Sequence, residues 1–338
     1  MTLQIAWFLL IGVLLTGYAI LDGFDLGVGI WYLFAKKDRD RRLLLRAIGP
    51  VWDANEVWLL TGGGALFAAF PDVYATVFSG LYLALMLLLF ALIFRAVATK
   101  FRTEADWPAW RSVWDVAFAV GSALPALLLG VALGNMLNGL PLDETKNYDG
   151  TFFNLLNPYS LLIGLVGFAM IATHGALFIV LKSDGELRER ARRWAASAWL
   201  AYLALFLVAG AVTLLTKPQL LTNHKGVSIL WVVPVAMLVA IGLIGLFNHL
   251  GRARMAFVGS ALSIAGMMGM AGASLYPNLV PASNLPERSL TIFNASSSAL
   301  TLKAMLIVSL VGMPIVLAYT IWLYRVFAGK PVLEEEGY

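Results

Sequence analysis

The stretch IAWFLLIGVLLTGYAILDGFDLGVGIWYLF, residues 5–34, decides the class of the fold. It is predominantly apolar, and its charged residues are Asp22 and Asp25. About 20 apolar residues suffice for a helix to cross the hydrocarbon core of a bilayer. No basic segment precedes the stretch, so we expect a retained membrane helix and not a cleaved signal peptide.

The composition of the whole chain extends this expectation. Hydrophobic residues make up 60% of the 338 residues and charged residues only 13%, whereas a soluble domain carries about 25% charged residues. Most of the surface is therefore expected to face lipid. The net charge of +4 is modest, and the sequence lacks the basic stripe with interleaved aromatic residues that is typical of nucleic-acid binding.

Apolar stretches of spanning length recur nine times along the chain. The predicted fold is an all-α polytopic membrane protein with nine transmembrane helices and no extramembrane domain. The two longest predicted loops are 138–157 and 276–300. The predicted spans lie near 5–34, 50–71, 73–99, 112–137, 158–182, 194–215, 227–247, 254–275 and 301–326.

A short repeat suggests how these helices group. AFAVGSAL, Ala117–Leu124, in the fourth span resembles AFVGSAL, Ala256–Leu262, in the eighth. The hypothesis is a single membrane domain of two four-helix bundles, residues 1–137 and 158–275, with a peripheral ninth helix at 301–326. Small-residue strings also recur by chance in membrane helices, so the repeat stays open.

The basic residues predict the orientation. Most of the 24 lysines and arginines follow the odd-numbered spans, and cytoplasmic loops carry an excess of such residues. We therefore expect the N-terminus outside and the C-terminus in the cytoplasm. The loops predicted to be cytoplasmic contain Lys36, Lys37, Arg39, Arg41, Arg42, Arg46, Arg95, Lys100, Arg102, Arg111, Lys182, Arg188, Arg190, Arg192, Arg193, Arg252, Arg254, Arg325 and Lys330.

Two carboxylates lie inside the first span. Asp22 and Asp25 in LDGFDLGVG share one helix face, in the half of the span nearer the cytoplasm. A carboxylate in the membrane is costly unless it is paired, hydrated or protonated. The pair is interpreted either as polar contacts between helices or as part of a proton relay or ion site. Gly23 and Gly27 allow a second helix to approach closely.

Two more acids open the second span, in GPVWDANEVWL, Gly49–Leu59. Asp53 falls in the first helical turn, where the helix dipole by itself favours a negative charge. Glu56 lies one turn deeper on the same face. Because the first span ends where the second begins, these acids and the pair on the first span are expected at similar depth. Such a set of carboxylates suits proton uptake from the cytoplasm.

The sequence offers few metal or haem ligands. It contains no cysteine, which excludes disulfides, thiolate metal sites and iron–sulfur clusters. Its histidines are His174, His224 and His249. A hydrogen-bonded packing role is favoured for His174 over haem ligation, and the other two are expected in solvated loops.

These motifs resemble subunit II of the cytochrome bd quinol oxidases. The resemblance rests on LDGFDLGVG, on GPVWDANEVWL, on TGGGALFAAFPDVYATVFSGLYL (Thr61–Leu83) and on NASSSALTLKAML (Asn294–Leu306), and it covers essentially the whole chain. Ala54 stands where the family usually has glycine.

The resemblance implies a haem-free subunit of a quinol:O2 oxidoreductase in the bacterial inner membrane. In that family, subunit I carries two haems b, one haem d and the quinol-oxidising site. The family's proton-pathway aspartate maps onto Asp53, and the second aspartate of its G-F-D motif maps onto Asp25. Glu56 and Asp22 are added from depth and spacing alone. Membrane lipids, quinone and a small single-helix subunit are further partners that the sequence leaves open.

Two other classes of function compete with this interpretation. A proton- or cation-coupled transporter would also use acids within its spans and internal repeats. Against it, the repeat is parallel, since the fourth and eighth spans run in the same direction. A purely structural membrane scaffold is disfavoured because it would not need carboxylates within its spans.

Overall fold

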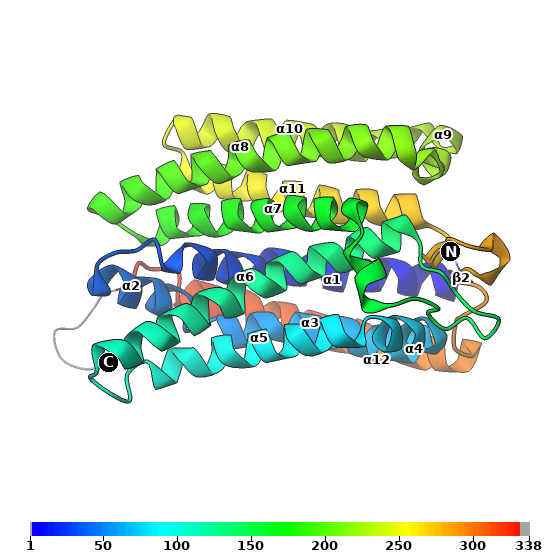
Figure 1. Ribbon diagram of the computed structural model, residues 1–338, viewed down its shortest axis with the longest axis horizontal. Helices are drawn as coiled ribbons and strands as arrows, with labels where there is room; N and C mark the ends of the chain where they lie inside the picture. The colour runs from blue at the N-terminus through cyan, green and yellow to red at the C-terminus, as the bar shows by residue number, and fades with distance from the viewer. Residues whose placement is uncertain (1, 332–338) are drawn as a thin grey trace.

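The computed structural model describes residues 2–331 as an elongated bundle of helices (Figure 1). The acidic segment 333–337, expected to be solvated, lies outside the described residues. The helices are α1 Leu3–Tyr32, α2 Asp38–Ile48, α3 Trp52–Ala69, α4 Pro71–Gly80, α5 Tyr82–Phe101, α6 Pro108–Asn138, α7 Pro158–Lys182, α8 Gly185–Thr216, α9 Thr222–Gly226, α10 Val232–His249, α11 Ala253–Leu275 and α12 Ala299–Val326. A two-stranded antiparallel sheet joins β1 Asn278–Val280 to β2 Leu290–Thr291.

Eight helices of residues 2–331 are long and apolar enough to cross a membrane, whereas nine spans are predicted from the sequence. Helix α3, which corresponds to the predicted second span, is not among the eight, because its acids, Asn55 and glycines lower its hydropathy. The predicted third span, 73–99, is divided into α4 and α5 at Leu81. Tyr148, from the loop after α6, packs where a side chain on Gly80 would lie, with its Cβ 2.6 Å from the Cβ position.

Helix α1 lies at the centre of the bundle and packs against α3, α6, α7, α11 and α12. Helix α7 in turn contacts α6, α8 and α11, and α10 packs against α8 and α11 (Figure 1). The closest approach of α1 and α7 is at Gly27 and Gly175, where a Cβ on Gly175 would lie 2.1 Å from the Gly27 carbonyl carbon. The close approach that was expected at Gly27 is confirmed.

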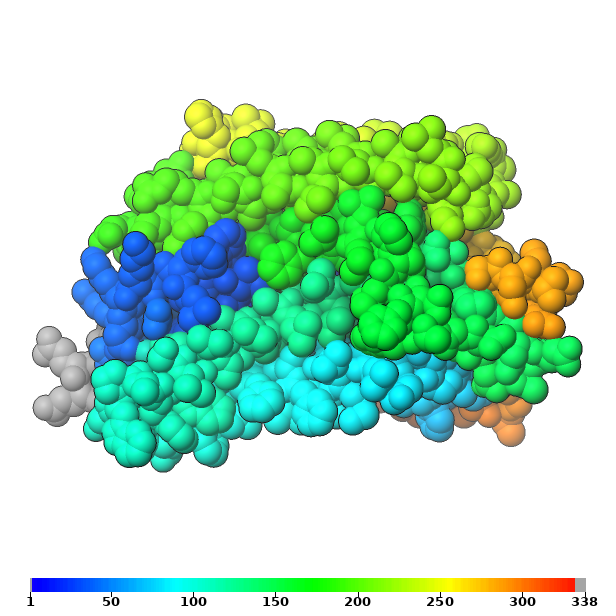
Figure 2. All heavy atoms as spheres, in the orientation of Figure 1, coloured from blue at the N-terminus to red at the C-terminus, as the bar shows by residue number. Residues whose placement is uncertain are grey.

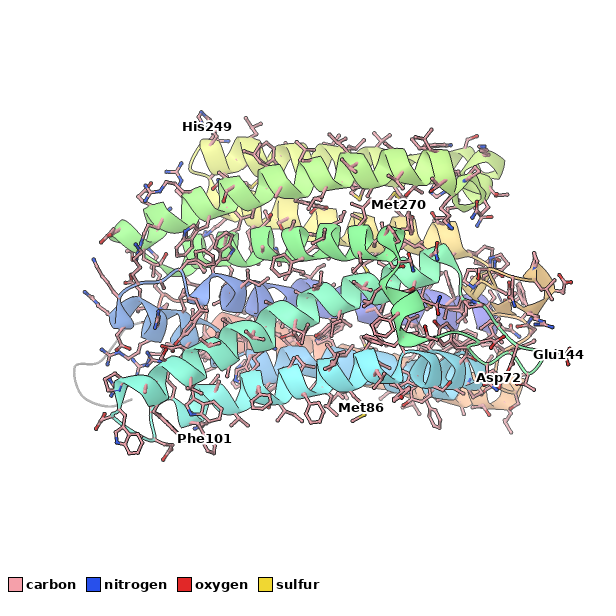
Figure 3. All side chains as sticks on the ribbon, in the orientation of Figure 1. Asp72, Met86, Phe101, Glu144, His249 and Met270 are labelled. Atoms are coloured by element: carbon pink, nitrogen blue, oxygen red, sulfur yellow. The ribbon has the colours of Figure 1, made fainter. Side chains whose placement is uncertain are left out.

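Loops and short elements gather at the two ends of the molecule, where α2 and the β1–β2 hairpin mark opposite ends (Figure 1). In the space-filling view, the blue atoms near the N-terminal quarter and the orange atoms of the late loop lie at these opposite ends (Figure 2). Phe101 and Glu144 lie at these same two ends (Figure 3). We call the end with α2 the basic end, because it joins the segments 36–46, 100–111, 182–193, 252–254 and 325–330. Ion pairs between these segments include Lys37–Glu186 at 2.5 Å, Arg190–Asp40 and Lys330–Asp184.

A buried cluster centred on Asp115 closes the basic end. The carboxylate of Asp115, whose side chain is 3% exposed, accepts hydrogen bonds of 2.6 Å from Tyr32, Arg41 and Arg102. Arg102 also pairs with Asp38 on α2. Segments 36–46 and 100–111 were predicted as plain loops; the first instead contains α2, which these contacts hold against α1, α5 and α6.

The two outlying histidines differ in exposure. His249, at the end of α10, is exposed as expected (Figure 3). His224 is only 1% exposed, so its expected solvation was wrong. The short helix α9 folds against α11 and the neighbouring 3₁₀ turns, and the ring of Trp231 packs edge-on against His224 at 5.7 Å.

Candidate functional site

Arg95 joins two of the predicted acids within the bundle. Its guanidinium, on α5, donates to Asp22 Oδ1 on α1 and to Glu56 Oε1 on α3, each at 2.9 Å. The side chain of Arg95 is 1% exposed, that of Asp22 0% and that of Glu56 24%. A buried charge is tolerated when an opposite charge and hydrogen bonds accompany it. Asp22, Arg95 and Glu56 therefore form an ion-paired triad that connects three helices.

Arg95 was expected in a cytoplasmic loop, and this was wrong. Arg95 lies inside α5, which continues for six residues to Phe101. Two signals pointed to it. The apolar sequence Ala96–Val97–Ala98 continues beyond it, and acids within neighbouring spans require a cation.

Asp25 belongs to a second polar connection between helices. Its Oδ2 accepts a 2.7 Å hydrogen bond from Asn55 Nδ2 on α3. The Asn55 amide oxygen in turn accepts from the Tyr324 hydroxyl on α12 at 2.9 Å. Asp25 is 0% exposed, and its Oδ1 has no hydrogen-bond partner among the described residues. An unpaired buried carboxyl oxygen is unusual and costly, and it is suited to a group that takes up and releases a proton.

Asp53 lies apart from the other three acids. It occupies the first turn of α3 at the basic end, where its side chain is exposed. It forms no ion pair or hydrogen bond with any described residue. The structure therefore brings together Asp22, Asp25 and Glu56, and leaves Asp53 at the entrance of α3, one helical turn from Glu56.

His174 has the packing role that the sequence favours. Its Nε2 lies 3.0 Å from the Ile20 carbonyl oxygen, which can only accept, so Nε2 carries the proton. Nδ1 then accepts from the Ser260 hydroxyl at 3.0 Å, and the ring stacks on Phe257 at 4.4 Å. Because both ring nitrogens are engaged, His174 does not fit the role of an axial haem ligand. No group of three or more His, Asp or Glu side chains in the described part of the chain is arranged to hold a metal ion.

Comparisons with known proteins identify the family. A family model described as cytochrome bd terminal oxidase subunit II matches residues 3–327. Cytochrome bd-I ubiquinol oxidase subunit 2 of Escherichia coli strain K12 is 40% identical, and the alignment covers 98% of this chain and 96% of that protein. Cytochrome bd ubiquinol oxidase subunit 2 of Bacillus subtilis is 36% identical, with 95% and 94% covered.

A solved structure agrees at the level of the fold. A chain of the bd oxidase from Geobacillus thermodenitrificans superposes with a TM-score of 0.80, covering 97% of this chain and 99% of that chain at 19% identity. The match over nearly the full length, together with the acids of LDGFDLGVG and GPVWDANEVWL, leads to one conclusion: the chain belongs to the cytochrome bd terminal oxidase subunit II family.

Proposed function

We propose that the chain is the haem-free subunit II of a bd-type quinol:O2 oxidoreductase in the bacterial inner membrane. In this role it scaffolds a haem-bearing subunit I, which contains the active site, and supplies part of the cytoplasmic proton pathway. The observation that carries the proposal is the group of acids on α1 and α3 in a chain that belongs to this family over its whole length. Family membership also favours the oxidase over the transporter alternative.

Oxygen reduction in subunit I requires protons, and this chain is proposed to supply part of their path. Two haems b and one haem d in subunit I carry out electron transfer from quinol and oxygen reduction to water. That reduction consumes protons, and hydrocarbon about 30 Å thick blocks their passage. Hydrated or protonatable groups must therefore reach inward from the cytoplasmic side.

The proposed proton path starts at Asp53 and continues to Asp25. Asp53 is exposed at the basic end, so it can exchange protons with water. Asp25 lies deeper, and Asn55 links it to α3, the helix that carries Asp53. Asp22 Oδ2 and Asp25 Oδ1 both lack a hydrogen-bond partner among the described residues, but Asp25 also lacks an ion pair there, which supports a role as proton carrier. Glu56, part-exposed and one turn from Asp53, is the intermediate group, whereas Asp22 is held by Arg95 and balances its buried charge.

The face of α12 is the proposed contact with subunit I. None of its most apolar 18-residue window is buried within the described chain. Exposed side chains on this face include Val308 at 71% and Ile315 at 66%. Next to α12, Gly63 and Gly64 of α3 have open space where a Cβ would lie, so a partner helix can approach closely. Quinone, lipids and a small single-helix subunit are candidate occupants of the remaining apolar faces.

The proposal also includes the topology. Helix α3 spans 18 residues, about 27 Å at 1.5 Å per residue, so it serves as a ninth crossing beside α1. An odd number of crossings leaves the N-terminus outside and the C-terminus in the cytoplasm, with the basic end inside. The adjacent helices α1, α3, α5 and α6 then form one bundle, α7, α8, α10 and α11 form the second, and α12 is peripheral.

The optical spectrum of the complex purified through an affinity tag on this chain tests the proposal. We expect co-purification of one larger subunit together with the absorption bands of haems b and d. The chain expressed alone should show no haem absorption. A colourless, monodisperse preparation without a partner from the native membrane would contradict the proposal and favour the transporter alternative.

A further inference from the structure

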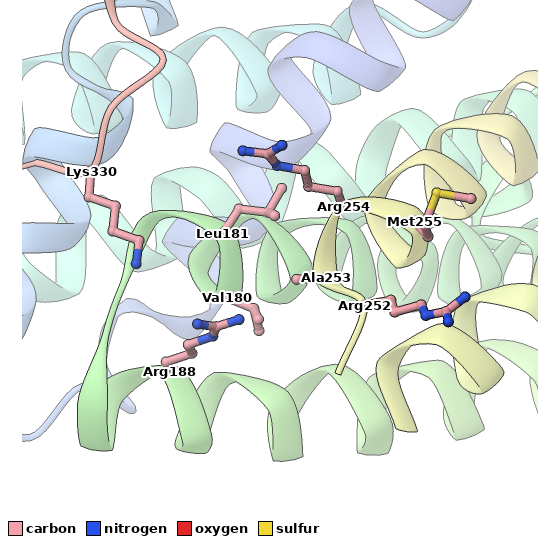
Figure 4. A pocket seen from close by; sticks show the side chains of 8 residues that line it. All are labelled: Val180, Leu181, Arg188, Arg252, Ala253, Arg254, Met255 and Lys330. Atoms are coloured by element: carbon pink, nitrogen blue, oxygen red, sulfur yellow. The ribbon is translucent and has the colours of Figure 1, made fainter. Parts of the chain in front are cut away.

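A hollow of about 330 Å³ lies at the basic end, between α7, α8 and the turn that joins α10 to α11 (Figure 4). Val180 and Leu181 of α7 form its apolar floor, and Arg188 of α8 and Arg254 of α11 extend toward this floor from opposite sides (Figure 4). Lys330, beyond α12, also lines the hollow, whereas the side chain of Arg252 points away from the floor (Figure 4).

Two arginines that line this hollow have no counter-charge among residues 2–331, whereas Lys330 pairs with Asp184. Arg188 and Arg254 make no ion pair or side-chain hydrogen bond with any described residue. The acids on the adjoining part of α8 are already paired, since Glu186 binds Lys37 and Glu189 binds Arg192. Arg188 and Arg254 therefore line one hollow without a counter-charge among the described residues, and this arrangement favours an anion.

The hollow continues into an apolar strip along α11. Met255, which lines the hollow, is 50% exposed, and Val258 and Leu262 are 51% and 57% exposed. Their spacing of three and four residues places them on one face of the helix. The strip leads from the basic end toward the middle of the bundle, so the site places two arginines next to an exposed apolar helix face.

We propose that this pocket binds the phosphate headgroup of an acidic phospholipid, whose acyl chains lie along Met255, Val258 and Leu262. Guanidinium groups match phosphate oxygens in bidentate geometry. Basic pockets between membrane helices at the cytoplasmic surface are suited to anionic headgroups. A free anion would use the arginines but not the apolar strip, and this difference separates the two sources of phosphate.

Native mass spectrometry of the delipidated oxidase complex tests the proposal. The complex is titrated with phosphatidylglycerol and, separately, with phosphatidylcholine that has the same acyl chains. Wild type should bind one phosphatidylglycerol in preference to phosphatidylcholine. Removing a surface cation weakens such binding about fivefold, so R188Q/R254Q should lose about 25-fold in affinity for phosphatidylglycerol.

Two further variants make the outcome specific. R193Q removes an exposed cation from the same helix outside the pocket, so it should bind the lipid as wild type does. R188K/R254K keeps both charges but loses the bidentate guanidinium geometry, so its affinity should lie between those of wild type and R188Q/R254Q. Equal binding by wild type and R188Q/R254Q would overturn the proposal. Competition by inorganic phosphate at the same concentration as the lipid would overturn it too, because the acyl chains would then contribute nothing.

Discussion

Replacing Arg95 with methionine should destabilise the protein strongly, because it leaves Asp22 as an unpaired buried charge. The Arg95 and Asp22 side chains are 1% and 0% exposed and lie 2.9 Å apart. Coulomb's law at an effective dielectric constant of about 20 gives about 6 kcal/mol for unit charges at this distance. Removal of one partner of a buried pair typically costs about 3–5 kcal/mol, and we expect a loss in that range.

The triple variant R95M/D22N/E56Q separates an unpaired charge from lost packing. It removes all three charges, so it should recover more than half of the stability that R95M loses. R111M is the matched control, since the Arg111–Asp106 pair is also short, at 2.6 Å, but exposed; its loss should be about 1 kcal/mol or less. The free energy of unfolding is measured by SDS titration in mixed micelles, with tryptophan fluorescence as the signal. If R95M and the triple variant lose the same free energy, the reasoning is refuted.

Three further predictions concern the basic end and the topology. D115N should lower the free energy of unfolding by about 2–4 kcal/mol in the same titration, because the buried guanidinium of Arg102 loses the charge of its buried partner Asp115. An unchanged midpoint would show that the cluster does not hold α2. Partial burial raises the pKa of Asp38, but the hydrogen bond and charge of Arg102 outweigh it and hold that pKa below its ordinary value of 3.8. Asp38 therefore stabilises the fold above pH 3.8 and loses this effect as the pH falls through the lowered pKa, so the stability difference between wild type and D38N should shrink below pH 3.8. Reporter fusions after Lys37, Arg102 and Arg193 should be cytoplasmic and those near Tyr148 and Asn284 external, and the reverse pattern would invalidate the predicted orientation.

The burial of Asp22 and Asp25 could be predicted from the sequence, but the partner of Asp22 could not. Apolar residues continue beyond Asp25 to Phe34, which placed Asp22 and Asp25 within the membrane and on one face of α1. Arg95 was assigned to a loop because a charged residue near the end of an apolar stretch lowers the local hydropathy, and a loop is normally predicted to begin there. Only the packing of α5 against its neighbours shows that Arg95 turns inward to Asp22 and Glu56.

The basic residues of segment 36–46 also led to a wrong prediction of its secondary structure. The run 36–46 was interpreted as a loop from its basic residues, whereas it forms the amphipathic helix α2, anchored through Asp38 and Asp40 to partners up to 150 residues away. The division between α4 and α5 has no strong local signal, because it depends on Tyr148 packing against Gly80. Such features depend on contacts between distant segments, which periodicity along one segment does not encode.

Turnover of the assembled oxidase with asparagine at position 53 tests the central claim most directly. D53N keeps the shape and a hydrogen-bonding side chain but removes the exchangeable acid. The matched control is D72N, since Asp72 is also exposed in the first turn of a helix, α4, at the opposite end of the molecule (Figure 3).

We expect D53N to assemble with full haem content and to consume oxygen at least about tenfold more slowly, because general acid–base groups typically contribute about 10²–10⁴-fold to a rate. D53E should retain more activity than D53N, and D72N should match wild type. Loss of haem or assembly in D53N would give Asp53 a structural role at the start of α3. Turnover at the wild-type rate in fully assembled D53N would contradict the proposal that protons enter through this chain at Asp53.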